Sequence, residues 1–130
     1  MSPERLVHHE LCFGCGRTNL FGLLMDIEPA GPGEARGRGF IKQDHQGPTP
    51  GRAHEGIVMA ALCDAMALAC GARSRASHVE LRLDAPVPVG SFLDVRAQTG
   101  ETNGDGIEAT ATASVNEQPV ARARGVFREI

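Results

Sequence analysis

Residues 56–70 read GIVMAALCDAMALAC, and this stretch decides the fold. Alanine, leucine and methionine dominate it, so the composition favours a helix over a strand. Apolar residues occur on every face of that helix, which predicts that it is buried on all sides. Gly71 follows as the expected C-cap, and Arg73 lies where the helix dipole favours a cation.

The segments around this helix alternate between apolar and polar residues, as half-buried strands do. Strands are predicted at residues 22–28 and 35–42 before the helix, and at 78–87, 92–99, 107–115 and 120–128 after it. Turns are expected at Asn103-Gly104 and Asn116-Glu117. The pattern predicts one α+β domain over residues 1–130, in which an antiparallel sheet of about six strands wraps around a single helix. Residues 1–21 are expected to form an irregular lead-in.

Length and charge exclude several classes of protein. The chain has 130 residues and a net charge of −3, which argues against a nucleic-acid binder. It shows neither a signal peptide nor an apolar run long enough to cross a membrane, so we expect a cytoplasmic protein with reduced thiols. One helix cannot cover both faces of six strands, and an edge strand invites pairing, so we expect at least a homodimer.

Asp64 is the only polar side chain in the helical stretch. An ionised carboxylate at a buried position is costly unless it is paired or opens into a cleft. In a cleft it would be a candidate general base. Alternatively, Asp64 bonds to neighbouring backbone or caps a partner chain, and the sequence alone does not decide between these interpretations.

The start of the helix is a second candidate site. The first N–H groups of a helix lack intrahelical partners and could stabilise an oxyanion, and those of Gly56 and Glu55 lie here. His54 and Glu55 could instead be a simple capping pair. Asp64 lies roughly 12–15 Å further along the axis, so both groups reach one carbonyl only if two protomers share a site or the ligand is extended.

Cys12 and Cys15, with His8 and His9 just before them, have a spacing typical of zinc ligands. No second close Cys/His pair follows, so His45 or His78 would have to complete a site through folding. Zinc at Cys12 and Cys15 is therefore a minor hypothesis, and no other cofactor is expected. Cys63 and Cys70 are most simply core residues.

With these residues in view, the chain resembles the hotdog-fold acyl-CoA thioesterases of the phenylacetate-degradation (PaaI-like) type. The similarity covers nearly the whole chain and rests on the order of several segments: CFGCGRTNLFGL at 12–23, HQG at 45–47, PGRAH at 50–54, GIVMAALCDAM at 56–66, LRLDAPVPVG at 81–90 and GVF at 125–127. The resemblance implies a dimer or tetramer with its sites at the dimer interface. There, a backbone N–H after a His-Gly-Gly histidine polarises the thioester, and a helix acid from the other protomer acts as base or nucleophile.

This sequence departs from that pattern in two ways. His-Gly-Gly reads His54-Glu55-Gly56, and Asp64 falls one residue later than the family acid when counted from His54. Aligning His54 puts Cys63 in the place of the acid, whereas aligning Asp64 puts Glu55 in the place of the histidine. We prefer Asp64 as the acid because a thiol is a poor base near neutral pH.

The resemblance implies an enzyme that hydrolyses a small, medium-chain or aromatic acyl-CoA, with CoA entering only as part of the substrate. Asp64, Gly56, His54 and Glu55 are the expected catalytic residues. Cys63, Ala60, Ser77 and His78 are the expected substrate contacts. The alternative is a hotdog protein that binds an acyl thioester or small carboxylate without turnover, as the irregular His54-Glu55-Gly56 allows.

Overall fold

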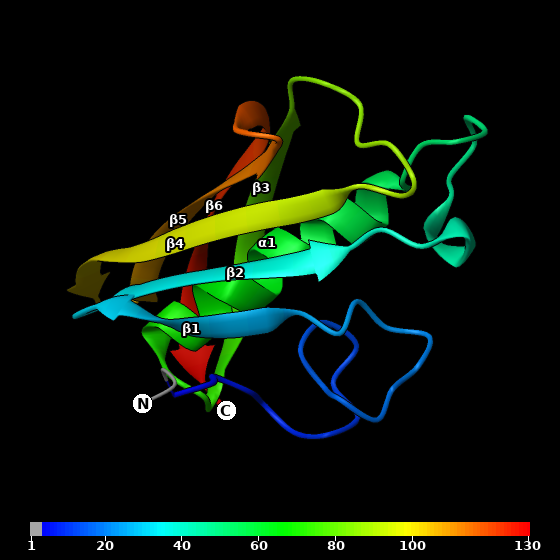
Figure 1. Ribbon diagram of the computed structural model, residues 1–130. Coiled ribbons are helices and arrows are strands. Elements are labelled where there is room, and N and C mark those ends of the chain that lie inside the picture. The colour runs from blue at the N-terminus through cyan, green and yellow to red at the C-terminus, as the bar shows by residue number, and fades with distance from the viewer. Residues whose placement is uncertain (1–3) are drawn as a thin grey trace.

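The computed structural model describes residues 4–130, so the first three residues of the predicted lead-in lie outside it. Six antiparallel strands form one sheet in the order β1-β2-β4-β5-β6-β3. The strands are β1 (Asp26–Gly31), β2 (Glu34–Phe40), β3 (Ser74–Leu83), β4 (Phe92–Asn103), β5 (Gly106–Val115) and β6 (Gln118–Glu129). The sheet curves around one long helix, α1 (Glu55–Cys70), and a short 3-10 helix, η1 (Gln43–His45), precedes it (Figure 1). The predicted fold is therefore confirmed.

Small side chains on the inner face of the sheet let it approach the helix closely. In β5, Ala109, Ala111 and Ala113 are buried, while the threonines between them are exposed, as the alternation predicts. On α1, Leu62 and Met66 are completely buried. A face built of alanine fills little volume itself, so these larger helix side chains complete the core.

The hairpin turns lie where the sequence places them. β4 ends at Asn103 and β5 begins at Gly106, so the Asn103-Gly104 turn is confirmed. Between β5 and β6, Asn116 and Glu117 have φ angles of 49° and 69°. Positive φ at both central residues matches the right-handed twist of the flanking strands, which explains the tight connection.

The strand predicted at residues 22–28 is displaced toward its C-terminal end. β1 begins only at Asp26, because the N–H groups of Leu23 and Met25 bond to the carbonyls of Phe13 and Gly14. Residues 22–25 therefore pair with the lead-in instead of continuing β1.

The strand predicted at residues 78–87 is displaced in the opposite direction. β3 begins at Ser74, where it already pairs with Glu129 of β6. It ends at Leu83 because the N–H groups of Asp84 and Ala85 both turn to the carbonyl of Val120. The remaining strands begin and end close to the predicted positions.

The prediction that the helix is buried on all sides does not hold for a single chain. Met59, Ala60 and Cys63 are only partly covered, and because Cys63 follows Met59 by four residues and Ala60 by three, they share one side of α1. Among residues 4–130, no helix is both long enough and apolar enough to cross a membrane.

Candidate functional site

The irregular lead-in packs directly against the middle of α1. Gly14 lies over Asp64 so closely that a Cβ atom at residue 14 would stand 2.5 Å from the Asp64 Cγ. The guanidinium of Arg5 fixes the segment from the other side by donating to the carbonyls of Cys15 and Met25, at 2.5 and 3.0 Å. Only glycine at residue 14 permits this approach, because any other side chain would clash with Asp64.

Asp64 is surrounded by side chains of this lead-in. Its Oδ1 lies 3.1 Å from the Nδ1 of His8 and accepts a hydrogen bond from the Sγ of Cys12 at 3.3 Å. The same His8 Nδ1 lies 3.4 Å from the Sγ of Cys15 and 3.6 Å from the Sγ of Cys12. These four groups, which we call the HCCD cluster, bring three lead-in residues and the helix acid together.

The carboxylate of Asp64 is buried but not fully satisfied. The side chain is 9% exposed, and its Oδ2 is buried with no hydrogen-bond partner among residues 4–130. Unpaired buried oxygens are costly, and they mark a position where water, an ion or a ligand can bind. Its hydrogen-bond partner is a side chain of its own lead-in and not neighbouring backbone, and the interpretation that it caps a partner chain stays a prediction.

Three of the four cysteine thiols lie in environments that disfavour the thiolate. Burial raises the pKa of the Cys15 thiol far above its usual range. Burial also raises the pKa of the Cys63 thiol, and the negative charge of Asp64 raises it further. Burial raises the pKa of Cys70 to about 11. All four cysteines are free. Without a bound cation, Cys15, Cys63 and Cys70 are therefore neutral thiols of low reactivity.

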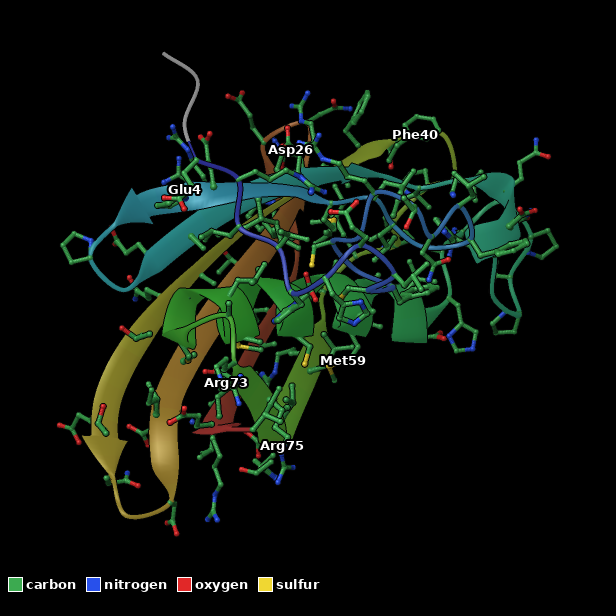
Figure 2. All side chains as sticks on the ribbon, turned by 90° about the horizontal axis from the view of Figure 1, so that it is seen from below. Glu4, Asp26, Phe40, Met59, Arg73 and Arg75 are labelled. Atoms are coloured by element: carbon green, nitrogen blue, oxygen red, sulfur yellow. The ribbon has the colours of Figure 1, made fainter. Side chains whose placement is uncertain are left out.

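A cavity of about 570 Å³ opens beside the HCCD cluster. Its walls combine Asp64 with small apolar side chains, among them Ala60 and Cys63, so the structure places these expected substrate contacts next to the acid. Arg73 and Arg75 line it where α1 leads into β3. Figure 2 shows both arginines on the side of α1 away from Asp26 and Phe40. The cavity thus joins an acid, an apolar wall and two cations.

The other predicted catalytic group lies at the far end of the helix. His54 is the N-cap of α1, and its Nδ1 accepts a hydrogen bond from the N–H of Gly56 at 2.8 Å. Because this Nδ1 is an acceptor, the 3.8 Å approach of Glu55 to it is not an ion pair with a protonated ring. All three residues are exposed, and within one chain none of them lines the cavity at Asp64.

Two further expected contacts also lie apart from Asp64. Ser77 donates to the carbonyl of Val126, and His78 lies exposed on β3 with its Nε2 3.9 Å from Glu80. Neither residue lines the cavity at Asp64 in this single chain.

The structure brings His8 to Cys12 and Cys15, but it does not bring His45 or His78 to them. His45 is the buried last residue of η1, where its Nδ1 accepts from the N–H of Lys42, and His78 lies on β3. His9 is exposed and its Nδ1 accepts from Leu11. The side chain that joins His8, Cys12 and Cys15 is Asp64, which sequence analysis assigned to a different role. The sequence does show a lone acid in the helix and a zinc-like Cys pair that lacks a fourth ligand. Because about 50 residues separate Asp64 from Cys12 and Cys15, the sequence does not show that they meet.

A larger cavity of about 740 Å³ lies on the outer face of the sheet, over β2 and β4. Four of its charged groups form two ion pairs: Arg36 with Glu28 at 2.7 Å and Arg38 with Asp94 at 2.8 Å. Arg38 also lies 4.9 Å above the ring of Phe92. These paired charges are less available to a ligand than the Asp64 oxygen that has no partner among residues 4–130.

The fold is shared with solved structures at low sequence identity. No family model matches the chain, and no curated protein matches its sequence. The E. coli PaaI protein from the phenylacetic acid degradation operon superposes with a TM-score of 0.74 and 21% identity, covering 83% of this chain and 80% of that one.

Two further structures agree with the first. A point mutant of the phenylacetic acid degradation protein PaaI of Thermus thermophilus gives a TM-score of 0.73 and 23% identity, covering 82% and 93% of the two chains. Zebrafish thioesterase superfamily member 2 gives 0.70 and 16%, covering 81% and 80%. The chain therefore has the hotdog fold of the PaaI-type and other thioesterase-superfamily proteins.

Proposed function

We propose that this protein hydrolyses an acyl-CoA thioester to the free acid and CoA, with Asp64 as the general base. The observation that carries the proposal is the buried Oδ2 of Asp64, which has no partner among the described residues and belongs to a side chain lining a cavity. A water molecule held by this oxygen would lose its proton as it attacks the thioester carbon. The fold it shares with thioesterase-superfamily structures supports the same conclusion.

The cavity also fits the two halves of such a substrate. Its apolar wall of alanines and Cys63 suits an acyl group, which gains by leaving water. Arg73 and Arg75 suit the phosphates of CoA, because guanidinium groups bind phosphate oxygens in pairs. Arg73 is 76% exposed and only loosely paired with Glu129, at 3.8 Å, so it is available to a ligand.

The proposed oxyanion donor must come from a second subunit. Gly56 and Asp64 lie more than two turns apart on one helix, so a single chain cannot present both to one carbonyl. β3 is an edge strand, and the partly covered stripe of α1 at Met59, Ala60 and Cys63 needs a partner. We therefore propose a homodimer or homotetramer in which the Gly56 N–H of one subunit, released by His54, faces Asp64 of the other.

We expect light scattering to give at least twice the monomer mass at micromolar protein concentration. The physical reason is the apolar area that a single chain leaves open along α1 and the unpaired side of β3. A monomer that persists at about 100 μM would contradict the shared site, since specific interfaces of ordinary size form well below this concentration.

The function is tested by measuring thiol release from a panel of short, long and aromatic acyl-CoAs. We expect at least one substrate to give kcat/KM above about 10⁴ M⁻¹s⁻¹, the lower end of the range for ordinary enzymes. Arg75→Gln is expected to raise KM for acyl-CoA more than for the same acyl group on a short thiol, because that thiol lacks the phosphates. No release from any member of the panel would contradict hydrolysis.

The second candidate function is binding of an acyl thioester or small carboxylate without turnover. The N–H of Gly56 is already bonded to His54, and Oδ1 of Asp64 is already bonded to Cys12, so both catalytic groups are partly engaged. The same panel separates the two functions. Saturable binding of an acyl-CoA by calorimetry without thiol release would favour the binding protein.

A further inference from the structure

The four donor groups of the HCCD cluster come from separate parts of the chain, yet they converge on one point. His8, Cys12 and Cys15 are in the lead-in and Asp64 is on α1, and their potential ligand atoms all lie within 4.8 Å of one another. We propose that these four residues bind one Zn²⁺ ion in a tetrahedral site. The proposal goes beyond hydrolysis and does not depend on it.

Four of the six spacings between the donor atoms are close to those of a zinc tetrahedron, and the other two are within 4.8 Å. With Zn–S of about 2.3 Å, Zn–N of about 2.0 Å and Zn–O of about 2.0–2.2 Å, neighbouring ligand atoms stand about 3.3–3.8 Å apart. The distances from His8 Nδ1 to Cys12 and Cys15 Sγ are 3.6 and 3.4 Å. Oδ1 of Asp64 lies 3.3 Å from the sulfur of Cys12 and 3.1 Å from Nδ1 of His8. An ion would require only small adjustments.

The electrostatics of the cluster also favour a bound cation. Burying the carboxylate of Asp64, whose Oδ2 has no partner among the described residues, costs free energy. A divalent ion at Oδ1 would compensate the negative charge. The backbone N–H of His8 points at the sulfur of Cys15, at 3.2 Å. Hydrogen bonds of this kind onto sulfur stabilise a metal-bound thiolate.

The set of donors selects the metal. Two thiolates and an imidazole are ligands that zinc prefers, and magnesium and calcium prefer oxygen ligands instead. Zinc accepts a carboxylate oxygen as its fourth ligand. Because all four positions are occupied by protein, the ion would fix the lead-in to α1, and part of its binding energy would stabilise the fold.

The test uses full-length protein without a polyhistidine tag, purified without chelators. We expect about one zinc per chain by plasma mass spectrometry, and about one Co²⁺ per metal-free chain with thiolate-to-cobalt absorption. Cys12→Ser and His8→Ala should lose most of the metal. The matched controls are Cys70→Ser, a thiol on α1 outside the cluster, and His9→Ala, the exposed neighbouring histidine; both should retain it.

The outcome is decided even where a variant does not fold. In that case, the cobalt titration of the unaltered protein decides the question, and circular dichroism checks that this protein is folded. Folded protein that takes up neither zinc nor cobalt overturns the site. Metal that is retained in folded Cys12→Ser and His8→Ala, or lost equally in the two controls, also overturns it.

Discussion

Replacing Asp64 by Asn is expected to lower turnover of the best acyl-CoA by about 10²- to 10⁴-fold, the usual contribution of a general base. The amide has nearly the same shape as the carboxylate, so it should still fit beneath Gly14 and beside the cavity. It cannot accept a proton from water near neutral pH. The loss should therefore appear in kcat, with KM for the acyl-CoA changed much less.

Asp105→Asn is the matched control, because this carboxylate is 86% exposed in the turn between β4 and β5 and lies outside the cavity. It should hydrolyse at the rate of the unaltered protein. If Asp64→Asn also does so, Asp64 is not the base. Zinc content measured on the same samples separates two causes. Loss of turnover with zinc retained assigns the effect to the carboxylate. If both are lost, Cys12→Ser, which loses the metal but keeps Asp64, decides: turnover that persists in this variant assigns the effect to the carboxylate.

The fold could be predicted because its signals are local. The helical stretch has the composition and the length of a buried helix, and the middle of β5 alternates alanine with threonine. The places where strands begin could not be predicted in the same way. Residues 22–25 resemble a strand, but the N–H groups of Leu23 and Met25 bond to the carbonyls of the lead-in. The periodicity of the sequence does not predict such tertiary hydrogen bonds.

The candidate site was predicted in separate pieces. Asp64 was singled out as a buried acid, and Cys12 and Cys15 as an incomplete zinc pair, each from its own neighbourhood. Their meeting depends on the path of a lead-in without regular structure, which is held by Arg5 and by hydrogen bonds between segments distant in sequence. No repeat or periodic pattern in the sequence predicts the course of this segment. The shared cleft that was expected between subunits stays a prediction.

Gly14→Ala tests that path directly, and it is expected to lower the stability of the protein by about 1–3 kcal/mol, the usual cost of overpacking a tight contact. The new Cβ would stand 2.5 Å from Cγ and 2.8 Å from Cβ of Asp64. These atoms sit near the helix backbone, so a side-chain rotation cannot move both away, and the lead-in must shift. For a chain of this size, we expect the melting temperature to fall by roughly 4–12 °C.

Gly104→Ala is the control, because an added Cβ there meets no atom within 4 Å and its φ is not in the left-handed region. Its stability should stay within about 0.5 kcal/mol of the parent. If Gly14→Ala melts like Gly104→Ala, the lead-in does not rest on α1. A shifted lead-in would also move His8, Cys12 and Cys15 relative to Asp64. The same substitution should therefore weaken zinc binding, so stability and metal content should fall together if one contact controls both.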